Sequence, residues 1–247
     1  MTKLLIYSIV TMIVILTSLF VINRKITNQN TKDNILKVFA VITVVIHYSS
    51  LWVDYFTTGE AQVDSTMLLP VYPCNICMWM LLIVAFMKDK QSALYKLLTE
   101  FLAIAGTVCG LIGLFANEIF ISNPDFFDYD SLKGLLSHST MIFGTMFILT
   151  QGYVKVRTIC MTISTAIGLC IFAIIGAIVN LIFYLCNLDP VNAMFMLEFP
   201  YDIPGASFIT LGILGVIVVF IMTSIYELLF LKSSERWYHN INKHKEV

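Results

Sequence analysis

Seven long stretches of mainly apolar residues constrain the fold of this chain more than any other feature of its sequence. A helix that crosses a bilayer needs about 20 such residues. The stretches are roughly 4–23, 34–53, 68–87, 97–121, 132–153, 160–187 and 205–231. We therefore predict an all-α, polytopic membrane protein: a bundle of about seven transmembrane helices that forms a single transmembrane domain over residues 1–247.

Composition excludes other classes of protein. Hydrophobic residues make up 58% of the chain and charged residues 13%, whereas soluble domains carry about 25% charged residues. The net charge is −1 and the sequence has no basic stripe, so we expect no binding to nucleic acid. The six cysteines lie mostly inside apolar runs, which excludes a secreted disulfide scaffold.

Lysine and arginine are distributed unevenly between the loops. All of them except Lys3 and Lys133 fall on one side, near residues 24–37, 88–96, 155–157 and 232–245. The opposite loops, about 54–67, 122–131 and 188–204, are acidic. Because positive loops stay in the cytoplasm, we predict an outside N-terminus, a cytoplasmic C-terminus and a multi-pass protein of the plasma membrane.

Several spans carry polar residues at a similar depth. His47, Cys74, His138 and Asn180 lie about 9 Å beneath the outer boundary at 1.5 Å per residue. Polar residues in the inner halves are fewer and scattered. Intramembrane polar groups are costly and frequently functional, although a lone histidine also suits an interhelical hydrogen bond. This layer therefore predicts a site open to the outer leaflet, with Glu118 as a further candidate at the outer interface.

The segment around Cys74 is the most informative. Proline favours the first helical position, so we predict a helix that opens at Pro73 and ends near residue 87, about 22 Å long. Cys74 would lie in its first turn, where the helix N-terminus favours a thiolate and free N–H groups can receive an oxyanion. Cys74 is thus a candidate nucleophile, with His138 or His47 as its base; an inert buried cysteine is the alternative.

Two other chemistries remain open for the same residues. Cys74 and Cys77 form a C-x-x-C pattern. Thiol redox chemistry would need a second cysteine pair in an outer loop, but the nearest outer cysteine, Cys186, is single. A zinc site of Cys74, Cys77, His47 and His138 would require these four side chains to meet. We expect neither a metal nor a cofactor.

Three motifs resemble those of a known family. Residues 69–75, with the sequence LPVYPCN, resemble the Leu-Pro-x-His/Tyr-x-Cys-Asp/Asn signature of the YwaF-like bacterial integral membrane proteins. His138-Ser139 resembles the family's histidine, and residues 192–196 followed by Pro200 resemble its Asn-x-Met-Phe/Tyr-Leu/Met segment. Chain length and number of spans are also similar.

The animal relatives of that family are the transmembrane protein 164 acyltransferases, whose Pro-Cys-His segment is similar to Pro73-Cys74-Asn75. A more distant similarity is to the androgen-induced-gene intramembrane hydrolases. The resemblance implies lipid acyl-group chemistry with Cys74 as nucleophile and His138 as base. Asn75 departs from the animal pattern, because a histidine stands there in the animal members.

The leading hypothesis is an intramembrane lipid acyltransferase or lipid hydrolase that acts from the outer leaflet. Its partners would be membrane lipids, with an acyl-bearing glycerophospholipid as substrate; the oligomeric state stays open. His47 would orient His138 or the headgroup, and the predicted binding residues are Asn75, Glu118, Asn180 and Asn192. The alternatives are a non-enzymatic seven-helix protein that binds or transports a small ligand, and third, a C-x-x-C redox protein.

Overall fold

The computed structural model describes residues 2–59, 69–116, 128–198 and 204–239. Within these residues the regular structure is entirely helical, which confirms the all-α prediction. The helices are α1 (Thr2–Lys25), α2 (Gln29–His47), α3 (Ser50–Thr58), α5 (Pro73–Phe86), α6 (Ala93–Phe115), α8 (Tyr129–Thr150), α9 (Thr158–Leu185) and α10 (Phe208–Phe230), with the short 3₁₀ helices η1 (Ala193–Phe195) and η2 (Ser233–Glu235).

Five of these helices are long and apolar enough to cross a bilayer: α1, α6, α8, α9 and α10. The α2–α3 pair, bent by 47° at its break, would add a sixth span if it crosses as one unit. Helix α5 is apolar but has only 14 residues. The chain is thus a multi-pass membrane protein, while the count of seven spans and the orientation stay predictions.

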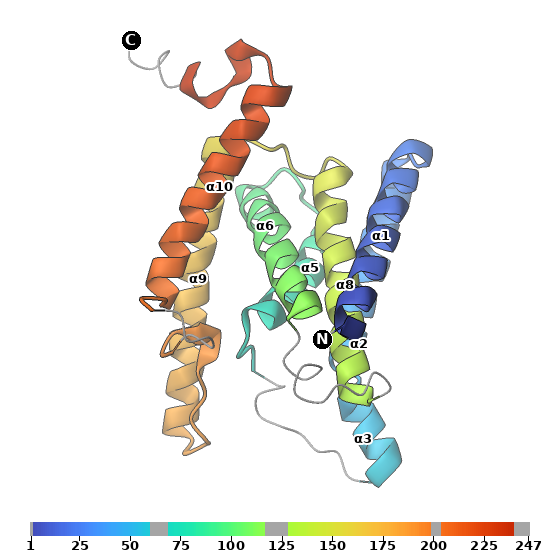
Figure 1. Ribbon diagram of the computed structural model, residues 1–247, viewed down its shortest axis with the longest axis vertical. Helices are drawn as coiled ribbons and strands as arrows, with labels where there is room; N and C mark the ends of the chain where they lie inside the picture. The colour runs from blue at the N-terminus through green and yellow to red at the C-terminus, as the bar shows by residue number, and fades with distance from the viewer. Residues whose placement is uncertain (1, 60–68, 117–127, 199–203, 240–247) are drawn as a thin grey trace. The chain divides into compact units, whose positions relative to one another are not determined.

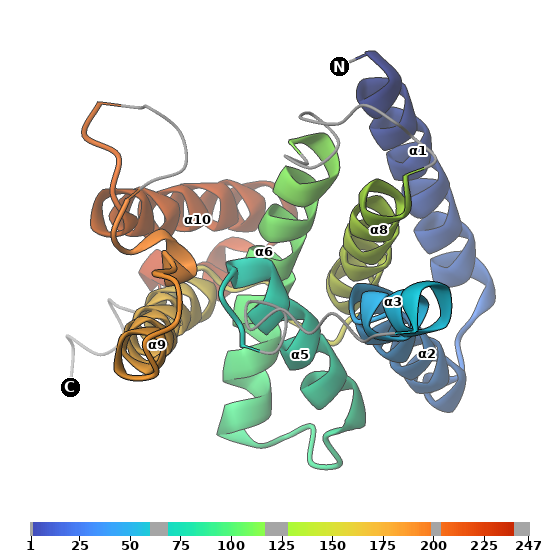
Figure 2. The same cartoon turned by 90° about the horizontal axis from the view of Figure 1, so that it is seen from below.

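The chain divides into two compact units, residues 1–153 and 154–247, and each is described by itself. The prediction of a single domain stays a prediction. In the first unit, α8 is central: it packs against α6 and α2, with α1 also beside it (Figures 1 and 2). Helix α5 packs against both α6 and α2. This packing places α5, α6 and α8 around a common interior.

Close contact between α6 and α8 depends on small residues. A Cβ added at Gly106 would lie 2.5 Å from the Thr145 Cγ2 atom, and one at Gly110 would lie 2.5 Å from the Ile142 Cγ1 atom. Met141 of α8 is fully buried, and its Cε atom would lie 3.4 Å from a Cβ at Gly110. Glycine at these positions therefore lets the backbones of α6 and α8 approach closely.

The second unit is an antiparallel pair of helices, α9 and α10, which lie side by side (Figure 1). A hydrogen bond from the Thr158 backbone N–H to the Glu227 carboxylate joins the start of α9 to the end of α10. Most large apolar side chains of α10 face outward, such as Ile209 and Leu229. Such an apolar outer surface suits a lipid environment.

Candidate functional site

Helix α5 begins where the sequence predicts. Pro73 occupies its first position and Tyr72 precedes it in an extended conformation. Cys74 lies in the first turn and is half-buried, whereas Asn75 is buried. The structure therefore confirms that the helix opens at Pro73 and holds Cys74 at its N-terminus.

The polar contacts of Cys74 are local. Its thiol donates a hydrogen bond to the Asn75 Oδ1 atom at 3.5 Å. The Asn75 backbone N–H, one of the groups expected to receive an oxyanion, donates to the Tyr72 carbonyl at 3.0 Å. An oxyanion at this helix start would thus have to compete with the Tyr72 carbonyl for that N–H group.

A third cysteine joins the pair on α5. Cys77 is fully buried one turn beyond Cys74, and Cys109 of α6 lies in the neighbourhood of both thiols. All six cysteines of the chain are free thiols. The sequence offered no motif for Cys109, because only the packing of α5 on α6 brings it to the C-x-x-C segment.

His138 projects from α8 with a defined tautomer. Its Nδ1 atom lies 2.7 Å from the Gly134 carbonyl oxygen. Because a carbonyl can only accept, Nδ1 carries the proton and the neutral ring keeps Nε2 as its basic nitrogen. The ring lies against Gly113 of α6, where an added Cβ would be 2.2 Å from Nε2.

His47 ends α2 and lies near the second histidine. Its ring meets the Tyr48 ring edge-on at 4.9 Å, and the Tyr48 hydroxyl accepts a hydrogen bond from Trp79 at 2.9 Å. His47 is close enough to His138 and Lys133 for electrostatic interaction. The two histidines that the sequence placed at one depth thus lie in the same region of the first unit.

Cys74 and His138 are related through α6. Cys74 lies near Cys109, and His138 lies on Gly113. Residues four apart share one face of a helix, so both groups lie toward the same face of α6. Among the described contacts, the thiol bonds Asn75 and the imidazole bonds Gly134, and no hydrogen bond joins the two groups. Their catalytic roles stay predictions.

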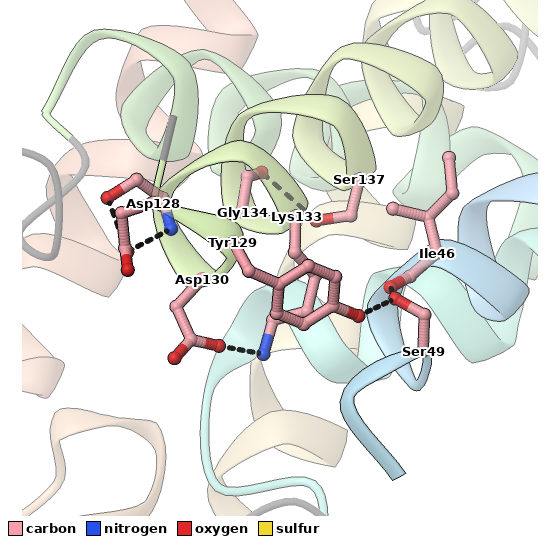
Figure 3. A network of polar contacts seen from close by, with 9 residues as sticks. Ile46, Ser49, Asp128, Tyr129, Asp130, Lys133, Gly134 and Ser137 are labelled. Carbon is pink, nitrogen blue, oxygen red and sulfur yellow. Dashed lines mark hydrogen bonds and ion pairs between the residues drawn. The ribbon is translucent and has the colours of Figure 1, made fainter. Parts of the chain in front are cut away.

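A polar network holds the start of α8 in place (Figure 3), and no sequence motif marks it. The Tyr129 hydroxyl bonds the Ser49 hydroxyl at 2.5 Å, and Ser49 also donates to the Ile46 carbonyl. Lys133 pairs with Asp130 at 2.8 Å. The network attaches α8 to the α2–α3 junction and so positions His138, which follows Lys133 on α8.

The other predicted binding residues have structural partners. In the second unit, Asn180 accepts a hydrogen bond from the Ala193 backbone N–H at 2.9 Å, and Asn192 accepts from the Leu197 N–H at 2.9 Å. Both asparagines thus hold the segment after α9. Their roles in binding, like that of Asn75, stay predictions, and Glu118 lies outside the described residues.

Metal-binding side chains do not gather at this site. Within residues 2–59, 69–116, 128–198 and 204–239, no three histidine, cysteine or acidic side chains are placed to hold one ion. The four-ligand zinc arrangement of Cys74, Cys77, His47 and His138 is therefore not formed by the described side chains.

Comparison with known protein families gives a match over most of the chain. A sequence profile described as the TMEM164 family matches residues 1–233. No curated protein and no solved structure matches the chain significantly.

Proposed function

The chain belongs to the TMEM164 family, and we propose that it is an intramembrane lipid acyltransferase or lipid hydrolase that uses Cys74 as its nucleophile. The observation that carries the proposal is the position of Cys74 in the first turn of a helix that opens at Pro73. A helix N-terminus favours an anionic sulfur. The family resemblance adds lipid acyl groups as the substrate class.

The proposed reaction has two steps. His138 Nε2 accepts the thiol proton of Cys74, and the sulfur attacks the ester carbonyl of a lipid. The ester C–O bond breaks, the leaving alcohol takes the proton from His138, and a thioester remains on Cys74. An acceptor hydroxyl or water then attacks the thioester and restores the thiol.

In this proposal, substrate binding brings the Cys74 thiol and the His138 imidazole to the reacting carbonyl. The proposed reaction requires a substrate carbonyl to lie between the thiol and the imidazole, which no described hydrogen bond joins to each other. Catalytic hydrogen bonds are often long before substrate binds. His47 would orient His138 or the headgroup, since its ring lies near both His138 and Lys133.

Intact-protein mass spectrometry tests the proposal. Wild-type protein, purified in mild detergent from lipid-rich membranes, should carry a fatty acyl adduct that hydroxylamine removes. Cys74→Ala should lack the adduct, whereas Cys186→Ala, which removes an exposed cysteine, should keep it. The proposal fails if Cys74→Ala protein retains full turnover of a lipid substrate identified for the wild type.

One observation favours the non-enzymatic alternative. The Cys74 thiol donates to Asn75 rather than to a histidine, as expected for a wall residue of a ligand-binding cavity. That alternative predicts slow, ordinary alkylation of Cys74 by an activated-acyl probe. The redox alternative instead predicts that Cys77→Ala is as damaging as Cys74→Ala.

A further inference from the structure

Lys133 is a largely enclosed lysine near the start of α8. Its side chain is 13% exposed, whereas that of Asp130, its ion-pair partner at 2.8 Å, is 57% exposed. The Lys133 ammonium also lies 5.8 Å from the centre of the Tyr129 ring. A lysine can bury its aliphatic stem while its charge stays at the polar boundary. Lys133 therefore presents a positive charge at the end of α8 that carries the polar network of Figure 3.

This charge lies in the same region as the two candidate histidines. Lys133 is close enough to His47 for electrostatic interaction. The Tyr129 ring, which lies beside the ammonium, is attached through its hydroxyl to Ser49, two residues after His47 (Figure 3). On α8, His138 follows Lys133 by five residues, or about 7.5 Å along the helix axis. A ligand that reaches the histidines thus comes near the ammonium.

Positive charge is scarce on this side of the chain. Under the predicted orientation, the outer loops are acidic and the outer side carries two basic side chains, Lys3 and Lys133. Lys3 is exposed at the start of α1. Among the described residues, the charged neighbours of His47 are His138 and Lys133. An anionic group that approaches the histidines would therefore meet Lys133.

The pairing of Lys133 with Asp130 leaves room for a second anion. An ammonium has three N–H donors, and Asp130 accepts one of them. Because Asp130 is more than half exposed and lies three residues away on the same helix, the pair contributes little to stability. Lysine binds phosphate oxygens through the same donors. A phosphate can thus bond beside the Asp130 carboxylate or replace it.

We propose that Lys133 binds the phosphodiester group of a glycerophospholipid, and that Asp130 competes with this phosphate for the ammonium. The choice of a lipid as ligand rests on the function proposed above. The inference adds the residue that selects a phosphate-bearing headgroup over a neutral glycerol ester. Since Lys133 contacts the headgroup and not the reacting ester, its loss should weaken lipid binding.

Lipid binding to a protein that cannot turn over its ligand tests the proposal. We would purify full-length Cys74→Ala protein in detergent and measure bound dioleoylphosphatidylglycerol and dioleoylglycerol by native mass spectrometry. Adding Lys133→Gln should lower the apparent affinity for the phospholipid at least about tenfold, as expected for one lost charge-assisted hydrogen bond. Binding of dioleoylglycerol, which has no phosphate, should stay unchanged.

Three further variants separate the charge of Lys133 from a structural role. Lys133→Arg keeps the positive charge and should keep most of the phospholipid affinity. Asp130→Asn removes the competing carboxylate and should raise that affinity. Lys3→Gln, which removes the exposed outer lysine, should leave it unchanged. If Lys133→Gln does not fold, Lys133→Arg and Asp130→Asn still test the proposal.

Three results would overturn the proposal. The first is equal phospholipid binding with and without Lys133→Gln. The second is an equal loss of dioleoylglycerol and phospholipid binding in that variant, which would show a structural role. The third is unchanged or weaker phospholipid binding in Asp130→Asn. All these proteins lack the Cys74 thiol, so such results leave the acyl chemistry untouched, and a wild type without an acyl adduct would leave the binding result untouched.

Discussion

At the scale of single residues, the position of the His138 imidazole depends on a missing side chain. The ring lies where a Cβ at residue 113 would stand, and its Nδ1 is held by the Gly134 carbonyl. Gly113 thus fixes the plane of the ring, while Gly134 fixes the tautomer. Together they direct Nε2, the atom that the proposed reaction requires as a base, toward α6.

Gly113→Ala should therefore disable the proposed base. The new methyl group would overlap the imidazole and displace it, and misplacement by about 1 Å can cost on the order of 10²-fold in rate. The expected result is a comparable loss of lipid turnover, with a changed rate of His138 carbethoxylation by diethyl pyrocarbonate.

Gly110→Ala is the matched control for this change. Its methyl group meets the buried Ile142 side chain on the same interface, so it overpacks α6 against α8 without touching the imidazole. Equal losses in both variants would contradict a specific role for Gly113.

Sequence patterns predict some residues of the candidate site but not others. Cys74 and Pro73 are visible because proline and a nearby thiol define a helix start along the chain. Cys109, Gly113 and Glu227 matter through contacts with other helices, which a single sequence does not reveal. Polar residues in the inner halves look scattered along the sequence for the same reason, because Thr158 and Glu227 meet only when α9 and α10 pair.

At the scale of elements, the end of α9 shows how the chain leaves a long apolar helix. The Asn187 N–H bonds the Tyr184 carbonyl, and the Leu188 N–H bonds the Phe183 carbonyl. Asn187 is left-handed, with φ of 52°. This arrangement is a Schellman motif, in which glycine usually occupies the left-handed position.

Asn187→Gly should stabilise the protein. Glycine adopts the left-handed conformation without the penalty of a Cβ, so we expect a gain of roughly 0.5–1 kcal/mol in the free energy of unfolding. Asn187→Ala should have the opposite sign. Thermal unfolding of the three proteins in one detergent measures both, and an identical Tm for all three would argue against the motif.

The segment after α9 is tied back to that helix by Asn180. Asn180 accepts the buried Ala193 N–H, and Met194 and Phe195 follow in left-handed conformations. Left-handed bulky residues persist only where surrounding contacts hold them. Asn180 is such a contact, and Met194 also packs over Gly176.

Asn180→Ala should loosen this segment. The unpaired Ala193 N–H would cost roughly 1–3 kcal/mol, seen as faster proteolysis within residues 188–198. Asn180→Asp retains the acceptor oxygen and should restore protection. Unchanged cleavage in Asn180→Ala would show that the hydrogen bond does not hold the segment.

At the scale of the whole molecule, the sequence predicted the class of fold because hydrophobicity alone defines membrane helices. Each of the seven apolar stretches overlaps a helix of the structure, and five helices are long enough to span. The second stretch is broken at residues 48–49, and the third is shortened by Pro73. Average hydrophobicity is insensitive to such breaks, since a bent or shortened helix remains equally apolar.

The predicted orientation can be measured with a membrane-impermeant maleimide. Cys186, exposed at the end of α9, should react in intact cells. A Gln91→Cys substitution, in a cysteine-free background, should react only after permeabilisation, because it lies in the lysine-bearing connection between α5 and α6. The reverse pattern would invert the topology and place Cys74 toward the cytoplasm.

The brevity of α5 has a consequence for the lipids around it. Its 14 residues span about 21 Å, against a hydrocarbon core of about 30 Å. A short apolar helix at a lipid boundary is accommodated by local thinning of the bilayer. Local thinning would bring the ester groups of the surrounding lipids closer to Cys74. The thickness of the membrane would then determine how often a substrate carbonyl reaches the thiol.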